Sequence, residues 1–212
     1  MSLRSRKIIV AGGSGLIGSA VVRALHDRKA YILNADIQDG DVFYDMAHPD
    51  SINTAIDFFG VPDVFINAAY PRDFVAHASG IIDASRIMLD KGCQNVINFS
   101  SIYGLKAPDF SIYPAGGNVE APSAEYAFLK AGVIGMTRYF AVRYAPSRVN
   151  AIAPGGVIDG QCQEFVRNYE RRTPLGRMAD VKDVVNAVMF LASDASGYIT
   201  GVTLAVDGGW TL

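Results

Sequence analysis

Short apolar runs alternate with longer stretches of helical periodicity along the chain. The runs are rich in Val, Ile and Phe, which favours strands, and they occupy residues 7–13, 30–36, 41–46, 62–69, 94–101, 147–156 and 201–209. Apolar residues recur at helical spacing in residues 16–29, 50–60, 79–91, 122–145 and 180–193. This alternation predicts parallel strands joined by right-handed crossovers. We therefore expect an α/β fold, a doubly wound parallel sheet with helices on both faces, formed by residues 1–212 as a single domain.

A glycine-rich segment, "AGGSGLIG" (11–18), joins the first predicted strand to the first predicted helix. Gly12 can make the tight turn, Gly15 lets the backbone approach a pyrophosphate, and Gly18 permits close packing of helix and strand. The helix N-terminus that follows attracts an anion. A plain strand–turn–helix built from small residues has the same pattern, so these glycines alone leave both interpretations open.

An acidic residue, Asp36, ends the second predicted strand, 24 positions after Gly12. At about this spacing a carboxylate meets the adenosine ribose of a bound dinucleotide. It accepts hydrogen bonds from two ribose hydroxyls and repels a 2′-phosphate. Ser14 and Asn34 lie nearby, with no Arg or Lys to bind such a phosphate. The cofactor predicted is therefore NAD and not NADP, although a solvated acid in a turn remains the alternative interpretation of Asp36.

Two further residues follow the third predicted strand. Asp45 and Met46 are placed to bracket an adenine, Asp45 by a hydrogen bond and Met46 by packing. An acid in a loop and a methionine in the core explain them equally well.

A tyrosine stands four residues before a lysine in "AEYAFLKAG" (124–132), on a predicted helix. Residues at this spacing are neighbours on the helix surface. Tyrosine has an ordinary pKa of about 10, which a nearby ammonium lowers, so Tyr126 and Lys130 can act as an acid–base pair. The same spacing is frequent in amphipathic helices and does not by itself indicate catalysis.

The composition narrows the class of protein. The chain has 212 residues, 50% hydrophobic and 19% charged, with a formal net charge of −2, which is typical of soluble globular proteins. We expect no nucleic-acid partner and no membrane span. The first residues are interpreted as a flexible tip and not a signal peptide, which favours a cytoplasmic protein. Cys93 and Cys162 are expected to be reduced thiols, and the scattered histidines predict no metal site.

Several segments, taken in order, resemble the short-chain dehydrogenase/reductase family over nearly the whole chain. "AGGSGLIG" resembles its cofactor loop, and "INAAY" (66–70) resembles its Asn-Ala-Gly segment, with Ala69 where glycine is usual. "NFSSIYG" (98–104) resembles its serine-bearing strand end, and "YAFLK" (126–130) matches its Tyr-x-x-x-Lys. "RVNAIAPGGV" (148–157) and "ITGVTLAVDGG" (199–209) resemble its sixth and seventh strand regions.

The resemblance implies a Rossmann-type sheet and a catalytic set of Ser101, Tyr126 and Lys130. Tyr126 would transfer a proton, Lys130 would also hold the nicotinamide ribose, and Ser101 would bind the substrate oxygen. Ser101 is preferred to Ser100 because side chains alternate along a strand and only one of the two can face the site. The implied cofactor contacts are Gly12, Ser14, Gly15, Leu16, Ile17, Gly18, Asp36, Asp45, Met46, Asn67, Ala68, Ala69, Tyr126, Lys130, Pro154, Gly155 and Val157.

The chain departs from the family pattern in places. His77 aligns with a frequent active-site Asn, and the chain is short between Tyr70 and Ser85 and again before "PLGR" (174–177). The long segment between Ser101 and Tyr126 is similar to that of bacterial oxidoreductases of flagellin and surface-sugar modification. This similarity favours a substrate site with a polar lining that could bind hydroxyls or phosphate. The candidate lining residues are Arg72, Tyr103, Tyr113, Asn118 and Gln161.

The expected function is an NAD(H)-dependent oxidoreductase that interconverts an alcohol and a carbonyl on a small sugar-like or polyol substrate. A sugar-nucleotide epimerase or dehydratase with bound NAD, and a non-catalytic NAD(H)-binding regulator, remain alternatives. The predicted helix 122–145 carries apolar residues on more than one face. This pattern favours a homodimer or homotetramer that buries one of those faces.

Overall fold

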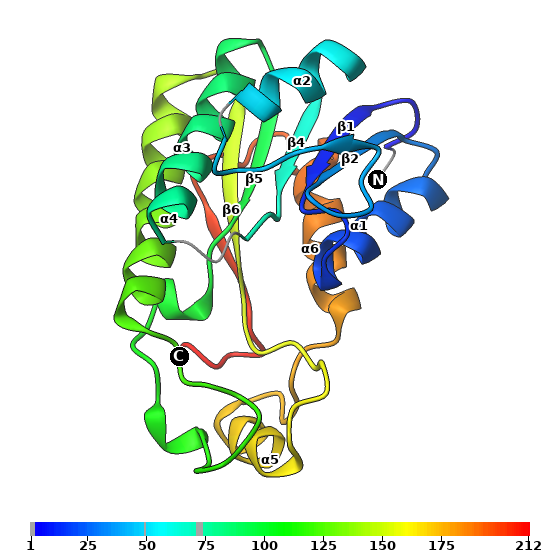
Figure 1. Ribbon diagram of the computed structural model, residues 1–212. Coiled ribbons are helices and arrows are strands. Elements are labelled where there is room, and N and C mark those ends of the chain that lie inside the picture. Colours follow the sequence, from blue (N-terminus) through cyan, green and yellow to red (C-terminus); the bar gives the residue numbers. More distant parts are fainter. Residues whose placement is uncertain (1–2, 49, 71–73) are drawn as a thin grey trace.

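A computed structural model describes residues 3–48, 50–70 and 74–212, with the side chains of residues 50 and 74–77 also outside the description. Its strands form one parallel sheet in the order β3-β2-β1-β4-β5-β6-β7 (Figure 1). The strands are β1 (Lys7–Ala11), β2 (Tyr31–Asp36), β3 (Val42–Phe43), β4 (Val64–Asn67), β5 (Asn95–Phe99), β6 (Arg148–Pro154) and β7 (Thr203–Val206).

The strand order reverses direction between β1 and β4, which lie side by side although α1, β2, β3 and α2 separate them in sequence. Ala11 at the end of β1 pairs with Asn67 at the end of β4. A crevice forms at such a switch point because the following connections leave to opposite faces of the sheet, and ligands of doubly wound sheets bind there.

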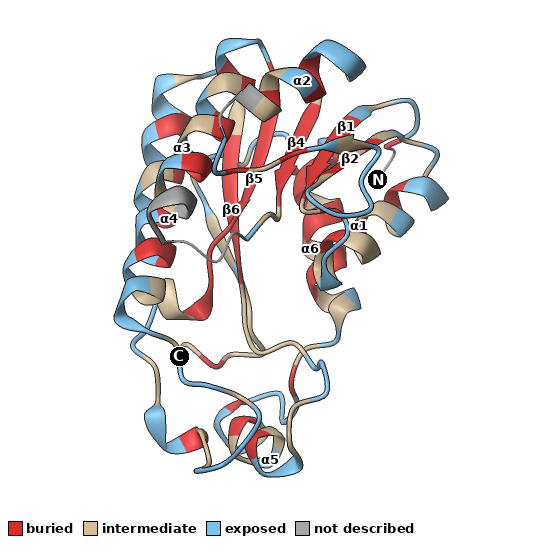
Figure 2. Ribbon diagram, in the orientation of Figure 1, coloured by how far each residue is buried: buried red, intermediate tan, exposed pale blue. Residues whose placement is uncertain are grey.

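Helices cover both faces of the sheet (Figure 1). Helices α2 (Asp50–Phe59), α3 (Phe74–Asp90) and α4 (Ala124–Arg143) pack on one face, and α1 (Leu16–Asp27) and α6 (Val181–Ala192) pack on the other. Adjacent strand residues point to opposite faces, so Ile9 joins the first core and Ile8 the second. Figure 2 shows the central strands buried along their length, as expected for a sheet covered on both sides.

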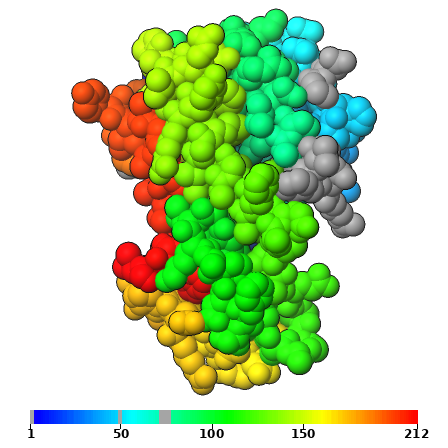
Figure 3. All heavy atoms as spheres, turned by 90° about the vertical axis from the view of Figure 1, so that its left-hand side faces the viewer, coloured from blue at the N-terminus to red at the C-terminus, as the bar shows by residue number. Residues whose placement is uncertain are grey.

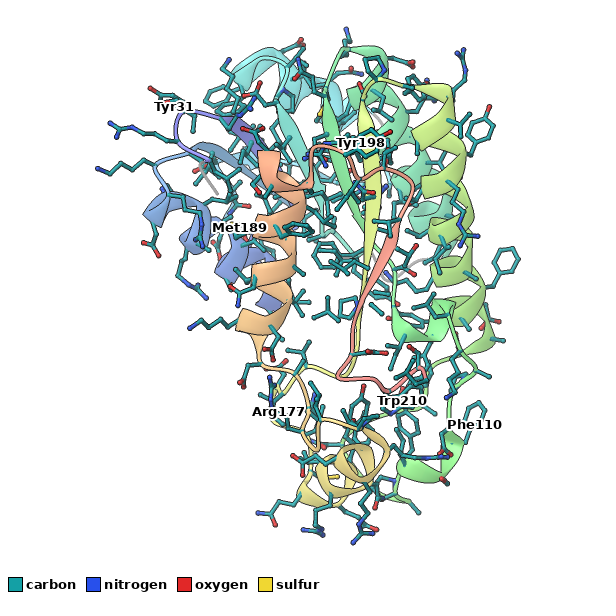
Figure 4. All side chains as sticks on the ribbon, turned by 180° about the vertical axis from the view of Figure 1, so that it is seen from behind. Tyr31, Phe110, Arg177, Met189, Tyr198 and Trp210 are labelled. Carbon is teal, nitrogen blue, oxygen red and sulfur yellow. The ribbon has the colours of Figure 1, made fainter. Side chains whose placement is uncertain are left out.

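A smaller lobe lies beyond the carboxyl ends of β5, β6 and β7. It contains the short 3₁₀ turns η1 (Ile102–Gly104) and η2 (Phe110–Ile112), helix α5 (Gln163–Arg172) and part of the C-terminal tail. Its core joins Ile102, Ile112, Phe165, Tyr169, Met178 and Trp210. Trp210 follows β7 in the C-terminal tail and so joins the end of the sheet to this core (Figure 4).

The predicted fold class is confirmed, and the differences are local. Helix α3 begins at Phe74, five residues before the predicted 79. Helix α5 was not predicted, because only Phe165 and Tyr169 of its ten residues are buried and most of the others are charged or polar. Strand β3 comprises only Val42–Phe43, whereas six residues were predicted. A last short 3₁₀ turn, η3 (Asp194–Ser196), precedes β7.

Candidate active site

A cavity of about 720 Å³ opens at the switch point, between the glycine turn and the ends of β2 and β4. It contains most of the residues expected to contact a cofactor. The lining residues are Gly12, Ser14, Gly15, Leu16, Ile17, Gly18, Asp36, Ile37, Gln38, Tyr44, Asp45, Met46, Ala68, Ala69 and Tyr70. The volume suits a large part of a dinucleotide, since ligand sites commonly measure about 300–1,000 Å³.

The three glycines differ in what a side chain would meet. Gly12 has a φ of +76°, and a Cβ there would lie 2.6 Å from the Ala69 backbone. A Cβ on Gly18 would lie 2.0 Å from the carbonyl oxygen of Gly12. A Cβ on Gly15 would meet only that same oxygen, at 3.5 Å, so the remaining space around Gly15 is open. Two glycines therefore serve close packing, and the third leaves room for a ligand at the N-terminus of α1.

Asp36 lies on the rim of this cavity. Its carboxylate accepts hydrogen bonds from the backbone N–H groups of Ser14, at 2.9 Å, and Gln38, at 3.0 Å. It therefore fixes the glycine turn to the loop after β2 and is not merely a solvated acid. An ionised carboxylate offers about four acceptor positions, so two remain for further donors such as ribose hydroxyls.

Asp45 and Met46 also line the cavity. The Asp45 carboxylate accepts from the Ala47 N–H at 2.9 Å and contacts His48 Nδ1 at 2.8 Å. These contacts, the Ala47 hydrogen bond first, lower the pKa of Asp45 although partial burial opposes them. Met46 is buried against α3, where a Cβ on Gly80 would lie 2.2 Å from its Cγ. Met46 thus belongs to the core and to the cavity wall at once.

Asn67 ends β4 and is almost completely buried. Within the described part of the chain, neither its side-chain oxygen nor its nitrogen has a hydrogen-bond partner. Its neighbours Ala68 and Ala69 line the cavity, and the Ala68 N–H donates to Ala11 O at 2.9 Å. Asn67 therefore ends β4 beside the first cavity with hydrogen-bonding capacity that the described residues do not satisfy.

Ser101, Tyr126 and Lys130 meet where β5 ends and α4 begins. The Ser123 hydroxyl caps α4 by accepting from the Tyr126 N–H at 3.2 Å, which places Tyr126 in the first turn. The Ser100 hydroxyl donates to Lys130 O at 2.7 Å and so ties β5 to α4. Ser100 is thereby engaged in packing, while Ser101 reaches the phenol of Tyr126.

The Ser101 hydroxyl interacts with both Tyr103 and Tyr126. Ser101 Oγ accepts from the Tyr103 N–H at 3.2 Å. The side-chain hydrogen bond with Ser101 lowers the pKa of Tyr126. Burial has the larger effect, however, and the pKa of Tyr126 is raised overall, with Tyr70 and Tyr113 adding to the rise. The Tyr–Lys spacing predicts that the ammonium of Lys130 lowers the pKa of Tyr126, so the rise in this pKa is opposite to that expectation.

Lys130 is buried, and burial lowers its pKa to about 8. Its Nζ donates to Phe99 O at 3.1 Å and lies 5.6 Å from the centroid of the Tyr126 ring. It also lies 5.2 Å from the ring centroid of Tyr70, whose ring is 6.0 Å from that of Tyr126. Two aromatic faces therefore surround the ammonium and partly offset its desolvation.

A second cavity, of about 210 Å³, is lined by Tyr126 and by residues of the lobe that contains α5. Its walls combine two of the three catalytic candidates, Ser101 and Tyr126, with aromatic and small residues, whereas Lys130 does not line it. The lining residues are Ser101, Ile102, Tyr103, Tyr113, Val119, Tyr126, Pro154, Gly155, Gly156, Gln161, Phe165, Tyr169 and Met178. Tyr126 and Ser101 thus face a chamber that a substrate could enter.

Some predicted residues have other contacts. Val157 lines neither cavity; its carbonyl accepts from Gln161 Nε2 at 2.9 Å. Gln161 lines the second cavity, but its oxygen accepts from the Asp159 N–H at 2.7 Å. The Asn118 amide is engaged with the Gly160 and Cys162 backbone, at 2.9 and 2.7 Å, and does not line that cavity. Arg72 and the side chain of His77 lie outside the described residues.

Sequence reasoning missed two contributions to this region. Tyr70 is half-exposed and lies beside Lys130 and Tyr126. Its position directly after the "INAA" segment was the sequence signal that could have identified it as a site residue. Tyr169 and Phe165, four residues apart on α5, form a wall of the second cavity. The Tyr169 hydroxyl accepts from the Gly156 N–H at 2.6 Å and fixes the loop after β6.

Comparison with known proteins identifies the family. A family model described as enoyl-(acyl carrier protein) reductase matches residues 78–211. The chain is 31% identical to cis-4-hydroxycyclohexanecarboxylate dehydrogenase of Sinomonas cyclohexanicum, over 97% of this chain and 96% of that protein. The chain belongs to the short-chain dehydrogenase/reductase family. The resemblance inferred from the sequence motifs is thereby confirmed.

Other members of the short-chain dehydrogenase/reductase family resemble the chain as closely. Post-translational flagellin modification protein A of Campylobacter coli is 29% identical, over 99% of this chain and 100% of that protein. A short-chain dehydrogenase from Leptospira borgpetersenii, solved with bound NAD⁺, is 31% identical with a TM-score of 0.85, covering 100% of this chain and 94% of that one. The Campylobacter alignment runs over 257 positions, more than the 212 residues of this chain.

Two further features are absent from the described part of the chain. No group of three or more His, Cys, Asp and Glu side chains there is arranged to hold a metal ion. No helix there combines the length and apolar character that crossing a membrane requires.

Proposed function

We propose that the chain is an NAD(H)-dependent oxidoreductase that interconverts an alcohol and a carbonyl on a sugar-like or polyol substrate. The observation that carries this proposal is that Ser101 and Tyr126 line the second cavity, with Lys130 beside Tyr126. Tyr70, which lines the first cavity, contacts both Tyr126 and Lys130. The family membership supports the reaction class. The flagellin-modification relative, and a relative named for a hydroxylated cyclohexanecarboxylate, support a hydroxylated substrate.

Each of the three catalytic candidates has its own role in the proposed reaction. Ser101 hydrogen-bonds the substrate oxygen, and Tyr126 takes the proton from the alcohol during oxidation or returns it during reduction. Lys130 favours the phenolate of Tyr126 through its charge. When bound, the nicotinamide ring accepts or supplies the hydride. The first cavity would hold the dinucleotide, with Gly15 and the first turn of α1 at the pyrophosphate and Asp36 at the adenosine ribose.

NAD is proposed over NADP on the basis of Asp36. No described residue of the first cavity wall is Arg or Lys, so a 2′-phosphate would meet carboxylates without a compensating cation. Two similar structures agree: the Leptospira protein holds NAD⁺, and a 4-hydroxyisoleucine dehydrogenase, 25% identical with a TM-score of 0.77, is complexed with NADH.

We expect NADH to bind at least about tenfold more tightly than NADPH, and Asp36→Asn to reduce that ratio by about tenfold, because it removes the charge that repels the 2′-phosphate. Fluorescence titration of the wild type and the variant with both nucleotides measures the ratio. Asp57→Asn, an identical charge change on the exposed side of α2, should leave it unchanged. Tighter binding of NADPH by the wild type would show that Asp36 has been misassigned.

We also propose that the chain forms a homodimer or homotetramer through α4. Phe128, Tyr139 and Val142 are exposed on this helix, and Gly132 and Gly135 lie between them at helical spacing, with open space where a Cβ would point. Figure 3 shows α4 beside α3 on one broad face of the molecule. Such a face lets a second helix approach closely. Light scattering should give at least twice the chain mass of 22.8 kDa, and a monomer would contradict the proposal.

A further inference from the structure

The second cavity contains a pair of tyrosines whose hydroxyls bond to each other. Tyr103 OH and Tyr113 OH are 2.6 Å apart, and both side chains line the chamber that Ser101 and Tyr126 face. The two residues come from η1 and from the end of η2, both within the long segment between β5 and α4. The catalytic assignment gives this pair no role.

The pair is held in place by an aromatic cluster. The Tyr103 ring packs edge-on against Trp210 at 5.7 Å between centroids, and the Tyr113 ring packs against Phe165 at 5.3 Å. Tyr169 stacks on Trp210 at 5.8 Å and closes the cluster. Polar groups fixed in this way bind a ligand group without first having to be ordered.

The chemistry of the pair matches a hydroxyl group. Two phenols that share one hydrogen bond retain one O–H donor and several acceptor positions, and an alcohol likewise donates once and accepts. Burial raises the pKa of both Tyr103 and Tyr113, so both remain protonated at neutral pH.

Charge and size restrict the ligand further. Every described residue that lines the chamber is uncharged at neutral pH, so a carboxylate or phosphate buried there would have no cation partner. A cavity of about 150 Å³ accommodates benzene. The chamber of about 210 Å³ therefore has room for a six-membered ring with a few hydroxyls, whereas a nucleotide sugar is much larger.

We propose that the Tyr103–Tyr113 pair binds a second hydroxyl of a small neutral substrate, so that the site selects cyclic diols and polyols over mono-alcohols and acids. The proposal rests on the proposed function, because it takes the reacting hydroxyl to lie at Ser101 and Tyr126. The tyrosine pair determines specificity and takes no part in proton transfer.

The test compares cyclohexane-1,2-, -1,3- and -1,4-diols with cyclohexanol and with 4-hydroxycyclohexanecarboxylate. Turnover with NAD gives kcat/KM, and calorimetry on the NAD-saturated protein gives affinity independently of turnover. We expect at least one diol to exceed both cyclohexanol and the acid by about tenfold or more, since a site built for a hydroxyl discriminates strongly against its absence. Tyr113→Phe should remove most of that preference, because it should lower kcat/KM for the diol much more than for cyclohexanol.

The control is Tyr198→Phe, which makes the same chemical change on a fully exposed side chain far from the lobe (Figure 4) and should alter nothing. Tyr103→Phe provides a second variant if Tyr113→Phe does not fold, as judged by thermal unfolding. Equal losses for diol and cyclohexanol, a preference for the acid, or no binding of any diol would overturn the proposal. Failure of the proposed function is distinguishable, because it appears as turnover that survives Tyr126→Phe.

Discussion

Replacing Tyr126 with Phe should lower kcat for a turned-over alcohol by about 10³-fold, within the range that general acid–base groups contribute. The variant keeps the ring that contacts Lys130 and Tyr70 and removes only the hydroxyl that hydrogen-bonds to Ser101. NADH affinity should therefore stay within about twofold, and the thermal unfolding midpoint should change little. Steady-state rates, together with an NADH fluorescence titration, separate the chemical step from cofactor binding.

The pH profile provides a second measurement on the same group. Burial raises the pKa of Tyr126, so little phenolate is present at pH 7. Alcohol oxidation needs the phenolate and should become faster as pH rises, while carbonyl reduction needs the phenol and should not. Lys130, whose pKa is lowered to about 8 by burial, loses its charge over part of the same range, which limits the gain.

Two outcomes would contradict the assignment of Tyr126. Turnover that persists at wild-type level in Tyr126→Phe would mean that another group transfers the proton. NADH binding without turnover of any alcohol, in wild type and variant alike, would favour a non-catalytic NAD(H)-binding regulator. The fully exposed Tyr198 supplies the control, because Tyr198→Phe should retain wild-type kcat.

Sequence periodicity predicted all seven strands of the described sheet and the five helices that cover it, because each buried strand and each amphipathic helix carries its own local signal. The set of Ser101, Tyr126 and Lys130 came from the family resemblance, and the predicted elements placed its members at the end of β5 and in the first half of α4. The preference for Ser101 over Ser100 came from side-chain alternation. In the structure Ser100 bonds to the backbone of α4, while Ser101 reaches Tyr126.

The lobe around the second cavity could not be predicted in the same way. Helix α5 buries only Phe165 and Tyr169, and these meet Tyr113 and Trp210, which lie about 50 positions before and 40 positions after them in the sequence. Such contacts depend on where the strands end in space and leave no periodic signal. Likewise, the raised pKa of Tyr126 follows from burial, which the Tyr–Lys spacing does not reveal.

Two alanine substitutions in the glycine turn should give opposite results. Gly18→Ala should lower the free energy of unfolding by about 2 to 3 kcal/mol, as overpacked sites do, because its Cβ would lie 2.0 Å from Gly12 O and 2.8 Å from Gly13 Cα. Gly15→Ala should leave that free energy within about 0.5 kcal/mol of wild type. Gly15 has a φ of −71°, which alanine adopts readily, and its Cβ would make only an ordinary contact.

Gly15→Ala should weaken NADH binding although it leaves the free energy of unfolding almost unchanged. Gly15→Ala keeps a stable fold but adds a methyl group where the backbone meets the pyrophosphate, so we expect NADH affinity to fall by at least about tenfold. Urea unfolding and NADH fluorescence titration on both proteins separate the two effects. If Gly15→Ala bound NADH as the wild type does, the dinucleotide would not pass over Gly15. The first cavity would then bind a different ligand, or bind the dinucleotide in a different orientation. A lower free energy of unfolding for Gly15→Ala would instead contradict the open space seen around Gly15.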